Sequence, residues 1–171
     1  ITKAVGIKES SFYNHFTGKA NLMENIYTIA DKDLKSIKLS PSTIEDLTTK
    51  LTLYQYLKNG IDRFLTNLDR PEAMKVWCVI SMEQYRDRRA GKIIVDEDKR
   101  VMEQISYAFR LFQEKGKMKD GDPMVLAHLY GYSLRAIHLV YTLHKTFDEQ
   151  SDYSRNKMYE VMELFVEKWE Q

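Results

Sequence analysis

The chain has 171 residues, enough to form one compact domain or two closely packed ones around a substantial apolar core. Hydrophobic residues make up 43% of it and charged residues 30%, which excludes a disordered chain, and a formal net charge of +1 excludes a uniformly basic nucleic-acid binder. With 7 glycines and 3 prolines, the composition favours helices over a loop-rich β protein.

The beginning of the chain has the pattern of a helix-turn-helix followed by a longer helix. A first helix, a turn at Gly6 and a short second helix over 8–16 would come before a break at Gly18. Apolar residues at helical spacing then predict a third helix over 19–37. The segment 39–42 is the best candidate for a linker to the rest of the chain.

The short helix over 8–16 is expected to be amphipathic. Phe12 and Phe16 are four residues apart and share one face, which should be the buried one. Lys8 and Lys19 lie near its two ends, and its opposite face carries hydrogen-bonding side chains, namely Ser10, Ser11, Tyr13 and Asn14. Such a face suits base edges and phosphates in the major groove of DNA.

At these residues the sequence resembles the TetR family of one-component transcriptional regulators. The resemblance is carried by residues 11–22, which read SFYNHFTGKANL. The family pattern has a small residue, an apolar residue, Tyr, a variable residue, His or Tyr, Phe, a turn, Lys and a Leu-containing helix. The resemblance implies that Tyr13 and Lys19 contact phosphate. It also places near the bases and the DNA backbone a further set, Lys8, Glu9, Ser10, Ser11, Asn14 and His15.

Two features depart from the family pattern. Glu9 is acidic where a DNA-facing surface favours neutral or basic side chains. The first helix of the family, which supports the helix-turn-helix, has no counterpart before Ile1. Because the sequence does not begin with Met, we expect that further residues precede Ile1 in the native protein.

Residues 39–171 have the pattern of successive helices. A single apolar stripe runs from Leu47 to Leu68, and further helices are expected over 71–88, 94–116, 123–144 and 153–169. The run 93–95 could by itself be a strand, but its flanks favour the start of a helix. The sequence therefore predicts an all-α protein, with a helix-turn-helix DNA-binding region over 1–38 and a helical ligand-binding and dimerisation domain over 39–171.

Methionine and aromatic side chains are frequent in the second region. Most such residues belong to a core, but apolar pockets with few polar groups also form between the helices of a bundle. We expect a largely apolar or aromatic small molecule to bind there. Its candidate contacts are Trp77, Met82, Tyr85, Phe109, Phe112, Tyr130, His138 and Tyr141.

The last two expected helices carry apolar residues at near-heptad spacing. Two such helices from each subunit would form a four-helix interface in a homodimer, as the family resemblance implies. The candidate interface residues are Ala127, Gly131, Leu134, Met158, Met162, Phe165 and Trp169. For each of them a place in the core of its own chain is an equally good interpretation.

The sequence offers little for catalysis or metal binding. His128, His138 and His144 are separated by ten and six residues and do not share a helix face, and neither a phosphate-binding glycine loop nor a convergent acid–base set is recognisable. We therefore expect no enzyme activity, metal or cofactor.

The single cysteine, Cys78, rules out a disulfide within the chain. No apolar run approaches the roughly 18 residues of a membrane span, which predicts a cytoplasmic protein without membrane contact.

These patterns lead to one functional hypothesis and two alternatives. A homodimer would bind a near-palindromic operator and be released by a small ligand, and repression rather than activation follows the family analogy. A helical protein–protein adaptor without DNA binding is the first alternative, and a small helical enzyme is the second.

Overall fold

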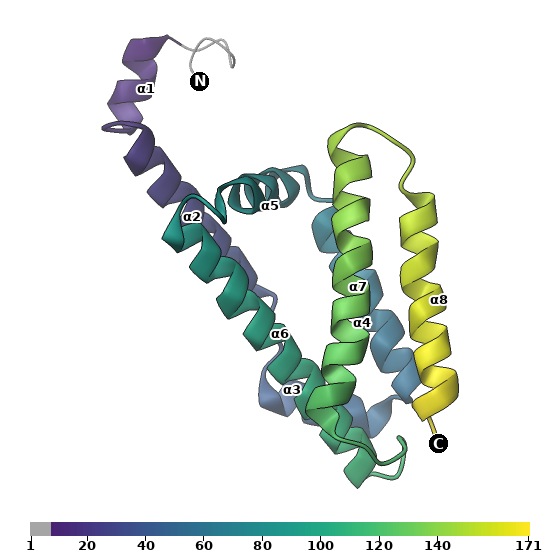
Figure 1. Cartoon of the computed structure of the whole chain (residues 1–171). Coiled ribbons are helices and arrows are strands. Elements are labelled where there is room, and N and C mark those ends of the chain that lie inside the picture. The colour runs from purple at the N-terminus through teal and green to yellow at the C-terminus, as the bar shows by residue number, and fades with distance from the viewer. Residues whose placement is uncertain (1–7) are drawn as a thin grey trace.

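The computed structural model describes residues 8–171, and within this range the chain forms eight α-helices and one isolated antiparallel bridge between Met118 and Glu170 (Figure 1). The helices are α1 (Glu9–His15), α2 (Lys19–Ser36), α3 (Pro41–Lys50), α4 (Leu53–Leu68), α5 (Pro71–Glu83), α6 (Arg88–Glu114), α7 (Pro123–Thr146) and α8 (Asp152–Trp169). The expected all-α class is confirmed. In this part of the chain, no helix is both long enough and apolar enough to span a bilayer.

The main core is formed by α4, α7, α8 and the second half of α6. Helices α6 and α7 meet at one end and diverge towards the other, where α5 lies across the opening between them (Figure 1). The buried side chains of the main core are Leu53, Leu57, Ile61, Leu65, Phe109, Phe112, Met118, Leu126, Ala127, Tyr130, Tyr141, Met158, Met162 and Val166. Their burial supplies most of the apolar stabilisation of the fold.

A second, smaller cluster attaches α2 to the rest of the molecule. It consists of Tyr27, Ala30, Ile80 and Ala90, with Met23, Val76, Ile93 and Ile94 packed against them, and we call it the α2 cluster. The hydroxyl of Tyr27 also donates a hydrogen bond to Asp87, at 3.2 Å, in the turn between α5 and α6. Helix α1 extends from the far end of α2, away from the body of the protein (Figure 1).

The apolar stripe over 47–68 belongs to two helices instead of one. Thr52 and Gln55 form a capping box that starts α4, with Gln55 N–H donating to the Thr52 hydroxyl at 3.2 Å and Thr52 N–H donating to the Gln55 side chain at 3.0 Å. The ammonium of Lys117 donates to three carbonyl oxygens at the end of α3, those of Thr48, Thr49 and Leu51, at 3.0, 2.7 and 2.9 Å. These caps satisfy the backbone groups that the break exposes.

The turn between α5 and α6 comes earlier than the sequence pattern predicts. Helix α5 ends at Glu83, and Asp87 starts α6 by accepting a hydrogen bond from the backbone N–H of Arg89 at 2.9 Å. The run 93–95 therefore lies inside a helix, and the strand alternative is wrong. Gly91 permits this tight turn, because a Cβ atom there would lie 2.9 Å from the carbonyl oxygen of Gln84.

Candidate functional site

Helix α1 keeps its two phenylalanines on one side. Phe12 is only 9% exposed and Phe16 is half-buried, and their ring centroids lie 5.4 Å apart. The predicted inward face of this helix is therefore confirmed. The preceding turn at Gly6 lies outside the described residues, as does the helix expected before it.

The other side of α1 faces solvent. Tyr13 is 62% exposed, and the remaining described candidates for DNA contact are also exposed, namely Lys8, Ser10, Ser11, Asn14, His15 and Lys19. Glu9 belongs to α1, but its side chain lies outside the described part of the structure. Among the described residues, nothing covers this polar face, and its role in DNA binding stays a prediction.

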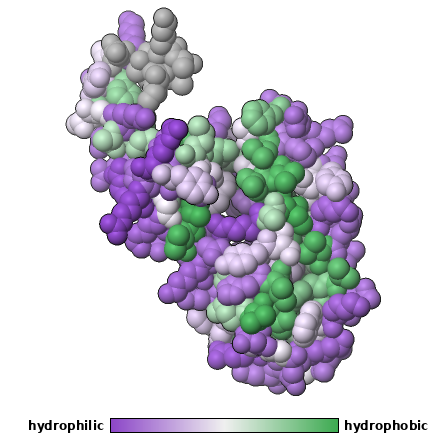
Figure 2. All heavy atoms as spheres, in the orientation of Figure 1, coloured by the Kyte–Doolittle hydropathy of each residue, from purple (hydrophilic) through white to green (hydrophobic). Residues whose placement is uncertain are grey.

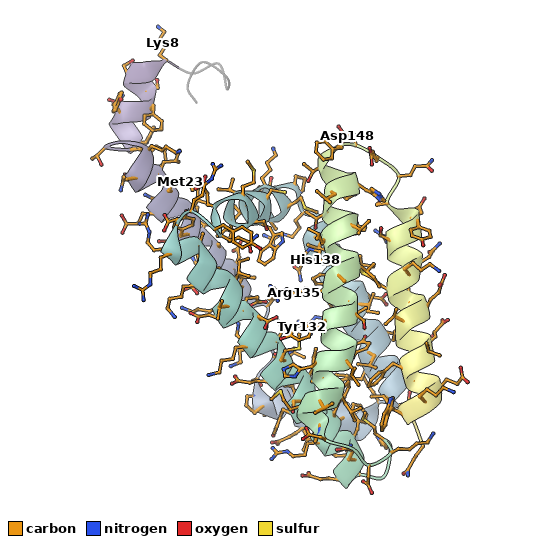
Figure 3. All side chains as sticks on the ribbon, viewed as in Figure 1. Lys8, Met23, Tyr132, Arg135, His138 and Asp148 are labelled. Atoms are coloured by element: carbon orange, nitrogen blue, oxygen red, sulfur yellow. The ribbon has the colours of Figure 1, made fainter. Side chains whose placement is uncertain are left out.

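A hollow of about 580 Å³ lies between α5, the first half of α6 and α7. Figure 3 shows Tyr132, Arg135 and His138 on the side of α7 that faces this space. Its lining consists of Trp77, Cys78, Ser81, Met82, Gln84, Tyr85, Ile94, Tyr132, Arg135, Ala136, His138, Leu139, Thr142, Leu143, Thr146 and Phe147. Its volume is within the range of sites that bind small organic molecules.

Half of the predicted ligand contacts line this hollow and half do not. Trp77, Met82, Tyr85 and His138 line it. The other four, Phe109, Phe112, Tyr130 and Tyr141, are buried in the main core, so their prediction as pocket residues needs correction.

Packing and hydrogen bonding explain why these four residues do not reach the hollow. Phe109 stacks on Phe165 with ring centroids 5.2 Å apart. The hydroxyl of Tyr141 donates to Asp69 at 2.6 Å, which ties α7 to the end of α4. Sequence spacing alone could not separate these inward positions from the pocket, because both sets lie on apolar faces.

Thr142 and Arg135 are pocket residues that the sequence pattern did not single out. Both are on the face of α7 that carries His138, at spacings of four and three residues, and this spacing is the signal that would have found them. The guanidinium of Arg135 pairs with Asp98 of α6 at 2.6 Å, and Tyr132 donates to the same carboxylate at 3.2 Å. These contacts join α6 to α7 beside the hollow.

His138 is a buried titratable residue in the lining of the hollow. Its ring lies against Phe64 and Trp77, at centroid distances of 4.9 and 5.9 Å. Burial, aided by the nearby charge of Arg135, lowers the pKa of His138 to about 4. The imidazole is therefore neutral at pH 7 and acts there as a hydrogen-bonding group without charge.

Four of the seven predicted dimer contacts need correction, because they are buried within the chain. Ala127, Met158 and Met162 are fully buried within their own chain. Gly131 allows close approach, but to α6: a Cβ atom there would lie 2.7 Å from the sulfur of Met102. The remaining candidates, Leu134, Phe165 and Trp169, pack against the main core but are only partly buried, so their place in a dimer interface stays a prediction.

An unpredicted apolar stripe lies on the outer face of α7. It consists of Val125, Leu129, Tyr132, Ala136, Leu139, Val140, Leu143 and Phe147, all exposed, and we call it the outer stripe. Figure 2 shows hydrophobic side chains gathered along this helix. Because α7 carries apolar residues at heptad spacing on two opposite faces, the sequence alone could not tell which face is buried in the chain.

Other parts of the described structure offer less for binding. A second hollow, of about 390 Å³, lies at the loop between α7 and α8 and is lined by polar residues, Lys145, Asp148, Glu149, Gln150, Ser151 and Asp152. Within residues 8–171, no three His, Cys, Asp or Glu side chains gather as a metal-binding group.

Comparison with known proteins identifies the fold. No protein-family model and no curated protein matches the sequence. Two solved structures do match: an inferred TetR-family transcriptional regulator from Mesorhizobium loti MAFF303099, with a TM-score of 0.63 and 18% identity, and an inferred transcriptional regulator from Saccharomonospora viridis in complex with choline, with a TM-score of 0.62 and 16% identity.

Each match covers 99% of this chain and 84% of the other protein. The chain therefore has a TetR-like fold, as the resemblance at residues 11–22 implies. At this identity the similarity defines the fold alone, and function has to be argued from the site.

Proposed function

We propose that the protein is a TetR-like transcriptional regulator of the cytoplasm, a homodimer that binds a near-palindromic operator and releases it when a small molecule occupies the hollow. The observation that carries this proposal is the position of α1. It is held away from the body (Figure 1), with Phe12 buried and its polar face exposed. Two parts of the proposal follow the family analogy: release of DNA by a ligand, and repression of transcription rather than activation.

The polar face of α1 has the chemistry for reading DNA. Tyr13 and Lys19 are exposed donors that would bind phosphates, while Ser11 and Asn14 have short side chains that would reach base edges. In a dimer, the two copies of α1 would enter successive major grooves about 34–36 Å apart.

The outer stripe favours the proposal that a second copy of this chain is the dimerisation partner. A contiguous row of apolar residues along an exposed helix face is more often covered by a binding partner than left in contact with solvent. Their heptad spacing suits the packing of α7 against α7 of a partner about a two-fold axis. Since Tyr132, Leu139 and Leu143 belong both to the stripe and to the lining of the hollow, the partner would also cover part of the hollow.

Substitution at Leu129 tests this part of the proposal. Leu129 is exposed on the outer stripe and does not line the hollow, so Leu129→Glu should yield monomers in analytical ultracentrifugation while helix content is unchanged. Glu163→Gln on the exposed side of α8 is the control and should leave the dimer intact. A protein that is monomeric before substitution would rule out this interface.

Helix α5 provides a direct connection between the hollow and α2. On one side Trp77 and Ser81 line the hollow, and on the other side Val76 and Ile80 pack in the α2 cluster. A ligand that displaces α5 would therefore tilt α2 and with it α1. This mechanism requires the ligand to bind the two arrangements with unequal affinity.

Selection of bound DNA from a random pool tests the function itself, using the full-length protein. We expect a two-fold symmetric consensus, and an affinity that falls steeply as salt is added because phosphate contacts release counterions. Ser11→Ala and Asn14→Ala should then change the preferred bases. Absence of DNA binding even at low salt would instead indicate a protein–protein adaptor.

A further inference from the structure

Two residues of α7 that line the hollow, His138 and Thr142, each carry a buried polar atom without a partner among the described residues. His138 is 9% exposed and Thr142 is 8% exposed, and their spacing of four residues places one above the other on the same helix face. Nε2 of His138 and Oγ1 of Thr142 have no hydrogen-bond partner among the described residues. Because buried polar groups are nearly always hydrogen-bonded, this pair marks where a polar atom of a ligand would bind.

The charges around the hollow argue against a cationic ligand. None of the described residues in its lining is Asp or Glu, so an ammonium group would have no carboxylate to pair with. The formal charge in the described lining is that of Arg135, and its pairing with Asp98 leaves little net charge there for a ligand of either sign. An anion would have to compete for Arg135 with Asp98, which already lies 2.6 Å from it.

The walls of the hollow favour a mostly apolar molecule. Trp77, Leu139 and Leu143 contribute apolar surface, and the volume of about 580 Å³ accommodates a substituted aromatic ring. The ring of His138 packs against Phe64 and Trp77, so these contacts restrict its orientation before a ligand arrives. Orientation in advance lowers the entropy lost on binding.

We propose that the hollow binds an uncharged, largely apolar molecule that carries one hydroxyl or carbonyl group, with its oxygen placed between Nε2 of His138 and Oγ1 of Thr142. This inference rests on the ligand-sensing role proposed above and names the chemistry of that ligand. It also separates this protein from the Saccharomonospora viridis regulator, whose structure contains the cation choline.

Calorimetric titration of the full-length protein with matched probes tests the proposal. The neutral probe is 4-propylphenol, propylbenzene has the same body without the hydroxyl, and choline is the cation. We expect 4-propylphenol to bind about tenfold more tightly than propylbenzene, since it would satisfy two buried polar groups that propylbenzene leaves unpaired. Choline should bind more weakly than either.

Two threonines on α7 provide a matched pair of variants. Thr142→Val removes the unpaired hydroxyl and should reduce the preference for 4-propylphenol over propylbenzene several-fold. Thr146→Val also changes the lining, but the hydroxyl of Thr146 already donates to the backbone oxygen of Thr142 at 2.7 Å, so the preference should persist. Thr142→Val should also raise the Tm of the unliganded protein, because a buried unpaired hydroxyl is removed.

Several outcomes would overturn the proposal: no binding of 4-propylphenol, equal affinity for the two neutral probes, tighter binding of choline, or a lower Tm for Thr142→Val. DNA binding is measured separately. A preference for 4-propylphenol without recognition of any operator would contradict the proposed role as a regulator, but it would support the proposed chemistry of the hollow. Operator recognition without that preference would refute the pocket chemistry alone.

Discussion

The main core and the α2 cluster differ in size and in the helices that they join. The main core gathers large side chains from α4, α6, α7 and α8, whereas the α2 cluster buries Tyr27, Ala30, Ile80 and Ala90. Two of those four are alanines, so fewer large buried side chains hold α2 to the body than form the main core. Regions with few buried apolar contacts open at a lower free-energy cost than the core does. The difference indicates that the main core is rigid and that α2 can move relative to it.

Truncation in the main core should have the largest effect. Phe109 is fully buried and stacks on Phe165 at 5.2 Å, so Phe109→Ala should lower the free energy of unfolding by about 3–5 kcal/mol. Urea denaturation measures this change. A loss below about 1 kcal/mol would mean that the main core is not the frame of the molecule.

The neutral state of His138, at the edge of the main core, should make stability depend on pH. Its pKa is about 4 in the folded protein and 6.5 as the ordinary value, so between these pH values the unfolded chain binds a proton that the folded chain does not. Stability from this group is present above pH 6.5 and is lost as pH falls towards 4, by about 3 kcal/mol in total.

The control for this pH effect is His138→Phe. Carboxylates elsewhere titrate in both proteins, so each protein is compared with its own stability at pH 7 in urea denaturation. Wild type should lose more stability than the variant between pH 6.5 and 4. Parallel pH profiles would show that His138 is not buried as a neutral group.

Truncation in the α2 cluster should have a smaller and more local effect. Ile80→Ala should lower the free energy of unfolding by about 2–3 kcal/mol, at the lower end for such a change because the cluster is small. Native-state hydrogen exchange should then accelerate in α2 and α5 while α7 and α8 keep their protection. Equal acceleration in α8 would contradict the separation of the two regions.

Substitutions at two helical glycines should give the smallest changes in stability. At Gly91 a Cβ atom would lie 2.9 Å from the backbone oxygen of Gln84, so Gly91→Ala should destabilise the turn beside the α2 cluster by about 1 kcal/mol or more. Gly60 in α4 has no atom within 4 Å of such a Cβ, so Gly60→Ala should stabilise the protein by about 0.5–1 kcal/mol. Thermal unfolding distinguishes the two, and a stabilising Gly91→Ala would contradict the tight turn.

Strong local signals made part of the fold predictable from the sequence. Prolines at the first positions of α3, α5 and α7, and the glycine with positive φ at Gly116, mark helix ends that correspond closely to those observed. The break at Thr52 was missed because the apolar period continues across it from α3 into α4. Only the capping box at Thr52 and Gln55 reveals it.

The candidate sites were predictable to different degrees. The exposure of the polar face of α1 follows from the spacing of Phe12 and Phe16. The pocket was predictable only in part, and the outer stripe was not, because α7 is apolar on opposite faces. Which face meets α6 and α8, and which remains outside, depends on packing between helices distant in the sequence.

The most direct test of the central claim is the affinity of the full-length protein for its selected operator after Tyr13→Ala and Lys19→Ala are combined. Both side chains are exposed, so the double variant should fold as before while its affinity falls for all DNA sequences and its salt dependence becomes shallower. An affinity and a salt dependence equal to those of the unsubstituted protein would show that α1 is not the helix that meets DNA.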